Sequence, residues 1–369
     1  MNYPGRLAGV RRAMGADGLD ALLVSNLVNV RYLCGFTGSN GYLFITPGTA
    51  RFITDGRYRF QAADEVHEAE VQICATHQEV IDTFNSLTAE HNLGRIGYEG
   101  THVTVASRGA AWEPPPGLDK LGAYFGDAEL VAVPGLVEEL RKVKDAGEIE
   151  AIRRAAAIGD RGFEYIVGKV KPGVTERELA LDLEFYMRSI GAEAMSFDVI
   201  VAAGERSALP HARPTDHKVE KGRFVLFDFG CVVDGYCSDM TRTVVVGPAD
   251  DRHREIYEMV LQSQTAGLEA VGPGIACGDV DAVARNVIAQ AGHEEAFMHG
   301  LGHGVGLEIH EAPSLKKGFP ELLQPGHVVT VEPGAYFKDW GGVRVEDLVA
   351  VTEDGIDTLS RAPRDLIVL

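Results

Sequence analysis

The sequence predicts an α/β (α+β) protein of two domains, a small one at the N-terminus and a larger, internally duplicated one at the C-terminus. Three observations support this prediction. The 369 residues suffice for two domains that each bury a core. Short β-type runs and amphipathic helical runs follow one another along the chain. Several motifs of the second part occur twice with similar spacing.

The first domain is expected over residues 1–130. Runs with high β propensity occupy residues 21–24, 41–46 and 50–55. Pro47-Gly48 lies between the last two runs and indicates a turn, so we expect these runs to form a hairpin. The proline-rich residues 111–118 are expected to form a surface loop.

The connection between the domains is expected at residues 131–144, and the second domain at residues 145–369. A long amphipathic helix is expected to run from about Asp145 to Val170. Thr175, with Glu178 three residues later, has the capping-box pattern and predicts the start of the next helix.

The second domain contains two similar halves. Each half has a Pro-Gly pair and then a helical run that ends near a glycine 19 residues after the proline (191 − 172 and 292 − 273). The pattern G-x5-D-x-G at Gly222 recurs as G-x5-E-x-G at Gly326, 104 residues later. A second carboxylate follows in each half, so neighbouring strands present two acids side by side. The four carboxylates are Asp228, Asp239, Glu332 and Glu346.

These four carboxylates lie in apolar, strand-like runs, where a solvated charge is not expected. Burying an unpaired carboxylate costs several kcal/mol, so such a residue is paired, protonated or bound to a metal. Arg242 is an alternative partner for Asp239, and Arg344 for Glu332 or Glu346. Asp347 should point to the opposite face of its strand from Glu346, so it is not expected to be a ligand.

Three histidines, His299, His303 and His310, share a segment with four glycines at positions 300, 302, 304 and 306. Glycines leave the backbone open to close approach by a ligand. We select His303 because glycines flank it, although spacing alone does not distinguish the three. Four carboxylates and an imidazole suit a pair of divalent ions such as Mn²⁺. Two such ions can activate water, which predicts a hydrolase.

The composition excludes several other classes of protein. The net charge of 35 − 54 = −19 argues against nucleic acids and anionic membranes as partners. The five cysteines show no C-x-x-C spacing, so a disulfide scaffold or zinc knuckle is not expected. There is no signal-peptide pattern and no apolar run of about 20 residues. We therefore expect a cytoplasmic protein.

The motifs resemble the metallopeptidases with the pita-bread fold (M24-type), which include methionine aminopeptidase, prolidase and aminopeptidase P. The resemblance covers residues 131–369. Its motifs are FDFG at 227–230, SDMTRT at 238–243, GHGVGLEIHE at 302–311, VEPG at 331–334 and GVRVED at 342–347. It implies five metal ligands, namely Asp228, Asp239, His303, Glu332 and Glu346.

The proline-specific branch of this family is the most similar. SALPHARPTD at 207–216 resembles its substrate-histidine segment, which implies that His211 lies at the site. His310 and Arg344 match two further residues around the substrate. Residues 29–41 and 53–62 resemble the creatinase-like N-terminal domain of small bacterial aminopeptidases P.

The resemblance implies an Xaa-Pro aminopeptidase, with a strict Xaa-Pro dipeptidase (prolidase) as the alternative. A non-catalytic binding protein or a creatinase-like hydrolase is less favoured, because all five ligands are present. The implied cofactors are two divalent ions, Mn²⁺ first and Co²⁺ or Zn²⁺ as alternatives. Glu332 would be the general base, while His211 and His310 would stabilise the oxyanion or carry protons. A homodimer is implied, with the N-terminal domain limiting substrate size.

Overall fold

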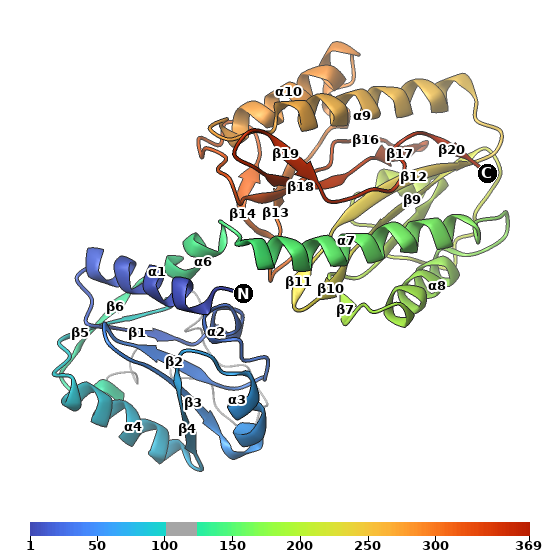
Figure 1. The fold of residues 1–369 in the computed structure, drawn as a ribbon. Helices are drawn as coiled ribbons and strands as arrows, with labels where there is room; N and C mark the ends of the chain where they lie inside the picture. Colours follow the sequence, from blue (N-terminus) through green and yellow to red (C-terminus); the bar gives the residue numbers. More distant parts are fainter. Residues whose placement is uncertain (101–123) are drawn as a thin grey trace. The chain divides into compact units, whose positions relative to one another are not determined.

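The computed structural model describes residues 1–100 and 124–369, which form two compact units (Figure 1). The units divide between Arg141 and Lys142. The predicted connection at 131–144 therefore includes the end of a strand and a whole helix of the first unit. The predicted loop at 111–118 lies outside the described residues. None of the described helices is both long and apolar enough to cross a membrane.

The first unit is built on a six-stranded sheet of described residues, in the order β4-β3-β2-β1-β5-β6. Its strands are β1 (Ala21–Val24), β2 (Tyr42–Ile45), β3 (Ala50–Asp55), β4 (Glu70–Cys74), β5 (Arg95–Tyr98) and β6 (Glu129–Ala132). Its helices among the described residues are α1 (Tyr3–Ala16), α2 (Leu27–Cys34), α3 (Arg59–Glu65), α4 (His77–Glu90) and α6 (Leu136–Arg141), with a 3₁₀ turn at Gly56–Tyr58. The predicted hairpin is confirmed, because β2 and β3 pair antiparallel across Pro47-Gly48.

The second unit has four long helices and several sheets. The helices are α7 (Ala146–Val167), α8 (Glu176–Ser189), α9 (Asp251–Ala270) and α10 (Cys277–Gln290), with 3₁₀ turns at Gly204–Ala208 and Glu294–Ala296. One sheet has the order β20-β12-β9-β8, from Ile367–Val368, Met240–Val246, Arg223–Phe229 and Ile200–Ala203. Another has the order β14-β13-β15-β18-β19, from Glu311–Leu315, Gly302–Gly304, Val328–Val331, Asp347–Val351 and Ile356–Thr358.

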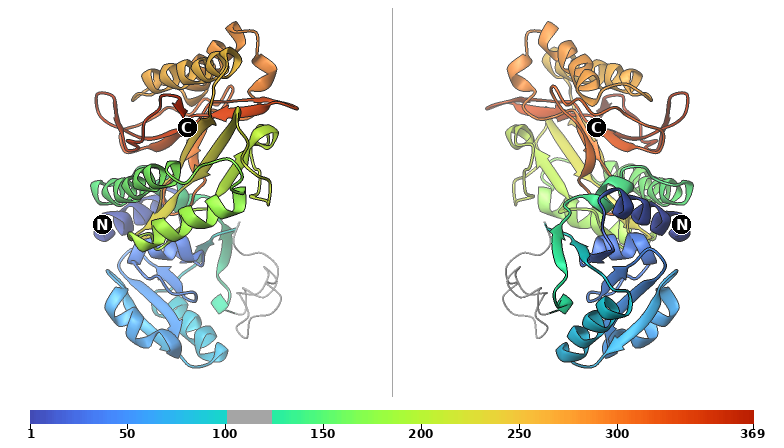
Figure 2. Two further views of the ribbon diagram at one scale, coloured as in Figure 1. Left: turned by 90° about the vertical axis from the view of Figure 1, so that its right-hand side faces the viewer. Right: turned by 90° about the vertical axis from the view of Figure 1, so that its left-hand side faces the viewer.

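Smaller sheets complete this unit. They are the hairpin of β16 (Gly334–Phe337) and β17 (Gly341–Arg344), and the strands β7 (Ala194–Met195), β10 (Cys231–Val233) and β11 (Tyr236–Cys237). Figures 1 and 2 show the strands between two helix pairs, α7 with α8 on one side and α9 with α10 on the other. The strands that carry or adjoin the four carboxylates therefore lie enclosed between helices.

The predicted helix boundaries are confirmed within a few residues. Asp145 and Thr175 each form a capping box, with Glu148 and Glu178 respectively, at the starts of α7 and α8. Such caps satisfy backbone N–H groups that the helix itself leaves unpaired. α7 ends at Val167, a little earlier than expected.

The predicted duplication is visible in the strands and in the cores. In the first half β9 pairs antiparallel with β12, and in the second half β15 pairs antiparallel with β18. Each half also has its own hydrophobic core, one beneath α7 and α8 and one beneath α9 and α10. The α8 and α10 helices both end just before a glycine with positive φ, Gly191 and Gly292. Each half is thus a helix pair packed on an antiparallel strand pair.

Candidate active site

The strand registers bring the four carboxylates together in pairs. Asp228 lies in β9 opposite Thr241 of β12, so Asp239, just before β12, lies diagonally across from it. Val331 of β15 is opposite Asp347 of β18. The next residues along, Glu332 and Glu346, therefore face each other at the ends of these strands. Both halves direct their acids to one place.

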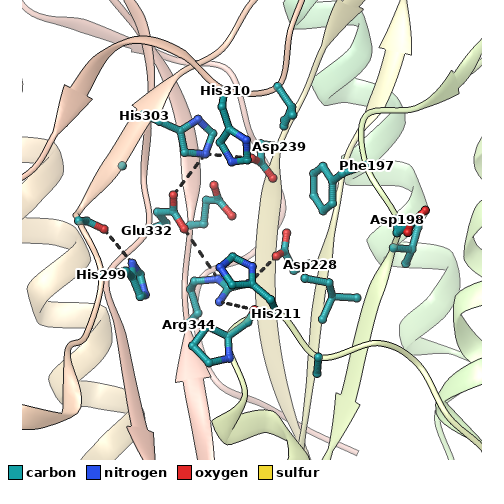
Figure 3. A pocket seen from close by; sticks show the side chains of 18 of the residues that line it. Phe197, Asp198, His211, Asp228, Asp239, His299, His303, His310, Glu332 and Arg344 are labelled. Atoms are coloured by element: carbon teal, nitrogen blue, oxygen red, sulfur yellow. Dashed lines mark hydrogen bonds and ion pairs between the residues drawn. The ribbon is translucent and has the colours of Figure 1, made fainter. Parts of the chain in front are cut away.

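All five predicted ligands meet in this place, and Figure 3 labels four of them, namely Asp228, Asp239, His303 and Glu332. Carboxylate oxygens of Asp228, Asp239 and Glu346 lie within 4.8 Å of one another. His303, in β13, places its Nε2 3.5 Å from Asp239 Oδ2 and 3.4 Å from Glu332 Oε1. His303 therefore connects an acid of the first half with an acid of the second.

The electrostatics of this cluster fit divalent cations. Asp239 Oδ1 and Glu346 Oε1 are buried and have no hydrogen-bond partner within the described part of the chain. An unsatisfied buried acceptor costs about 1–3 kcal/mol, and more when it is charged. Burial and the neighbouring carboxylates hold the pKa values of Asp239 and Glu346 well above their usual range. Positive charge at the cluster would remove both penalties, so the residues present fit bound divalent cations.

The alternative of separate ion pairs explains only part of the cluster. Arg242 bonds Asp347 at 2.7 Å instead of pairing with Asp239, and Gln264 holds the other oxygen of Asp347 at 2.9 Å. Asp347 is thus engaged away from the cluster, as its strand position predicts. Arg344 does pair with a predicted ligand, because its Nη2 lies 2.5 Å from Asp228 Oδ2.

Arg344 links the acids of both halves. Its Nε donates to Thr241 Oγ1 at 2.9 Å, and that hydroxyl donates to Glu346 Oε2 at 2.7 Å. Its Nη1 donates to the hydroxyl of Tyr336 at 2.7 Å. The side chain is buried, so the bonds shown hold the ligands in place, while the expected contact with substrate stays a prediction.

His299 supports Arg344 indirectly, through the hydroxyl of Tyr336. Its Nδ1 lies 2.8 Å from the carbonyl oxygen of Gly300, so we assign the proton to Nδ1, which donates. Its Nε2 then accepts from the Tyr336 hydroxyl at 2.9 Å. Burial lowers the pKa of His299 to about 4, so the ring is neutral near pH 7. The sequence grouped His299 with the other histidines, but no signal there indicated this role.

The cluster forms the floor of a cavity of about 490 Å³, a size usual for small-molecule sites. His211 and His310 line it beside the carboxylates, as predicted, and the His310 ring lies 4.4 Å from the His303 ring. Apolar residues form much of the wall, namely Phe197, Val199, Ile200, Pro210, Pro214 and Ile309. Sequence reasoning did not find these residues, because they carry no motif and gather only in the fold.

Both parts of the chain match known families. Residues 150–353 match the model of metallopeptidase family M24, and residues 6–143 match the creatinase/prolidase N-terminal domain. The chain is 33% identical to the Xaa-Pro dipeptidase of Pyrococcus furiosus, over 98% of this chain and 99% of the relative.

Two solved structures are similar over nearly their whole length. The Xaa-Pro dipeptidase from Bacillus anthracis has a TM-score of 0.92 and 39% identity, covering 100% of both chains. The X-Pro aminopeptidase from Thermotoga maritima has a TM-score of 0.88 and 36% identity, covering 97% of this chain and 100% of that chain. These matches confirm the predicted creatinase-like domain and pita-bread domain. The chain therefore belongs to metallopeptidase family M24.

Proposed function

We propose that this metallopeptidase is an Xaa-Pro dipeptidase, which hydrolyses the bond before proline in dipeptides. The observation that carries the proposal is the buried cluster of four acids and His303 at the floor of a small cavity. The similarity to Xaa-Pro dipeptidases from two organisms supports the choice of substrate. This reverses the order expected from the sequence, which favoured the aminopeptidase.

The aminopeptidase is the second candidate, because the similarity to the X-Pro aminopeptidase of Thermotoga maritima favours it. The two activities differ only in whether residues after proline are accepted. The cytoplasmic location, the homodimer and the restriction of substrate size by the N-terminal domain belong to this proposal as family expectations.

The five ligands would hold two divalent ions, with Mn²⁺ proposed ahead of Co²⁺ and Zn²⁺. Such ions lower the pKa of a bound water and polarise the substrate carbonyl. They would be held by Asp228, Asp239, His303, Glu332 and Glu346.

Other residues would act on the peptide directly. Glu332 is the proposed general base, because its carboxylate lines the cavity beside His303, where it can take a proton from a water held there. His211 and His310 reach the same cavity and can donate to an oxygen on which negative charge develops. The apolar wall around Phe197, Ile200 and Ile309 suits a proline ring.

The test compares Ala-Pro with Arg-Pro-Pro as substrates of chelator-treated protein, with and without added Mn²⁺. We expect Mn²⁺-dependent cleavage of Ala-Pro and little cleavage of Arg-Pro-Pro. Efficient cleavage of Arg-Pro-Pro would establish the aminopeptidase instead. Cleavage of neither peptide by protein with bound Mn²⁺ would contradict both.

A further inference from the structure

A dipeptide differs from a longer peptide at one point close to the scissile bond. Its proline ends in a free carboxylate, whose carbon lies three covalent bonds, about 3–4 Å, from the carbonyl carbon that is attacked. In a longer peptide a neutral amide occupies that point. Most ionisable side chains of the cavity are acids or histidines, so a second carboxylate needs a cation to enter favourably.

Three cationic side chains line the cavity: Arg213, Lys316 and Arg344. Arg344 is only 3% exposed, and its nitrogens are bonded to Thr241, Tyr336 and Asp228. Arg213 and Lys316 are exposed, and neither has a carboxylate partner among the residues that the structure describes. Lys316 makes only a cation–π contact, with its Nζ 5.0 Å from the centre of the Phe319 ring. These two side chains are thus available to an anionic group.

The strand register places Lys316 beside the metal ligands. Ser314 of β14 is opposite His303 of β13, and Leu315 is opposite Gly302. Lys316 continues this strand, so alternation puts it on the same face as Ser314, about 7 Å further along. Both residues line the cavity. A Cβ at Gly300 would lie 3.1 Å from the Lys316 Cβ, so this glycine leaves the room that the lysine stem occupies.

Arg213 comes from the other half of the unit and has a fixed backbone. Its carbonyl oxygen accepts from Arg206 Nη2 at 2.7 Å. Arg206 is in turn held by the fully buried Glu176, with its Nε 2.9 Å from Glu176 Oε1. Arg213 also lies two residues after His211, which lines the same cavity. The main chain of Arg213 is thus anchored while its guanidinium stays free.

We propose that Lys316 and Arg213 bind the C-terminal carboxylate of the Xaa-Pro substrate and so restrict the enzyme to dipeptides. This inference rests on the proposed function and identifies the residues that set substrate size. Hydrogen bonds to charged groups are stronger than neutral ones, so losing either cation should lower kcat/KM for dipeptides about ten- to a hundredfold. Peptides without a carboxylate at that point should be little affected.

The test compares Ala-Pro with its C-terminal amide, both with Mn²⁺, on wild-type protein and on Lys316→Met, Arg213→Met and the double variant. Wild type should prefer the free acid, and each substitution should raise KM for Ala-Pro while leaving turnover of the amide unchanged. Lys316→Arg keeps the positive charge, so this variant should retain the preference for the free acid. Lys317→Met is the matched control, because Lys317 is the adjacent exposed lysine but does not line the cavity.

The possible failures are distinguishable. If the double variant keeps the wild-type preference for the acid, the carboxylate site is wrong while the dipeptidase function stands. If wild type cleaves the acid and the amide equally well, the C-terminal carboxylate of the substrate is not recognised, and the inference is also overturned. If Mn²⁺-loaded wild type cleaves neither compound, the proposed function itself fails and the carboxylate site fails with it.

Discussion

Each half of the second unit uses a buried acid, paired with an arginine, to hold the segment that carries its histidines. In the first half, Glu176 of α8 accepts from the backbone N–H groups of Ala203 and Thr215, each at 2.9 Å. It also pairs with Arg206, and we call this pair the first anchor. The anchor joins the two ends of the segment that carries His211. Both Glu176 and its backbone partners are buried or half-buried.

In the second half, Asp281 of α10 accepts from the backbone N–H of Leu301 at 3.0 Å. It pairs with Arg285, which donates to the carbonyl oxygens of Phe297 and His299 at 2.9 and 2.7 Å. We call this pair the second anchor. It holds the backbone that leads through His299 to His303.

The anchors differ in what they leave free. The first anchor joins the two ends of the loop that contains His211. The His211 side chain is exposed and makes no hydrogen bond among the described residues. The second anchor holds the backbone at His299. Both ring nitrogens of His299 are hydrogen-bonded. One half thus supplies to the cavity a histidine that is free to adjust, while the other supplies fixed groups to the ligand cluster.

The largest expected effects come from removing one ligand in each half. Asp239→Asn and Glu346→Gln should each lower Mn²⁺-dependent hydrolysis of Ala-Pro by about a thousandfold or more, because neither half alone completes the ligand set. Calorimetric titration with Mn²⁺ would show weaker binding or a lost ion in both variants. If one of the two variants kept wild-type binding and activity, the halves would not share the site.

The next largest effects come from the anchors. Glu176→Gln and Asp281→Asn should each destabilise the protein by about 1.5–3 kcal/mol, because each removes a buried charged acceptor from a half-buried arginine and from backbone N–H groups. Glu176→Gln should also raise KM, and adding His211→Ala should cost little more, because both changes act through His211. Asp281→Asn should instead weaken Mn²⁺ binding. Urea denaturation, steady-state kinetics and calorimetry separate these outcomes.

Glu178→Gln provides the matched control for the first anchor. Glu178 lies on the same helix but bonds only Thr175 in its capping box. Its loss should cost about 1 kcal/mol of stability without changing KM. An equal rise of KM in this variant would show that destabilisation of α8, and not the anchor, moves His211.

A third effect is an opposite pH dependence of stability with and without metal. Burial raises the pKa values of Asp239, Glu346 and Glu332, the last to about 7. The metal-free folded state therefore binds more protons than the unfolded chain, whose carboxyls titrate near pH 4. Between pH 5 and 8 its stability should fall as pH rises. With Mn²⁺ it should rise, because binding requires the ionised carboxylates.

Thermal unfolding of chelated and Mn²⁺-loaded protein across this pH range measures both slopes. Asp239→Asn should flatten the slope of the chelated protein, since it removes one raised carboxyl. Identical slopes in the two states of the wild type would refute the link between the cluster and metal binding.

The smallest expected effect concerns Tyr336, whose hydroxyl is bonded to Arg344. Tyr336→Phe removes bonds to Arg344 and His299 but keeps the ring, so stability should fall by about 1–2 kcal/mol. Mn²⁺ affinity should fall by about tenfold, the lower end of the range usual for groups that orient metal ligands, because Tyr336 acts through Arg344. An effect as large as that of Asp239→Asn would mean that Tyr336 acts on the substrate or the ions directly.

The sequence predicted the parts of this molecule that local patterns encode. Alternating apolar runs and Pro47-Gly48 predicted the β2–β3 hairpin, and the Thr175–Glu178 pattern predicted the start of α8. The acids stood out because a carboxylate in an apolar strand requires a partner, and the duplication indicated that four of them share one place. The structure brings all of them together with His303.

Other features depend on contacts between distant segments, which no local pattern encodes. No local pattern indicated the bonds of Arg344 to Asp228 and Thr241, which lie more than 100 residues away in sequence. Glu176 and Asp281 looked like ordinary helix residues, and only the fold buries them against the histidine segments. The proposed carboxylate site likewise depends on which cations remain free in the cavity, and only the fold shows this.

The most direct test of the central claim is a Mn²⁺ titration of chelated protein that follows bound metal and Ala-Pro hydrolysis together. We expect two Mn²⁺ ions to bind per chain, with activity that rises as they bind and is absent without them. Full activity in metal-free protein, or two bound ions with no hydrolysis of Ala-Pro, would contradict it.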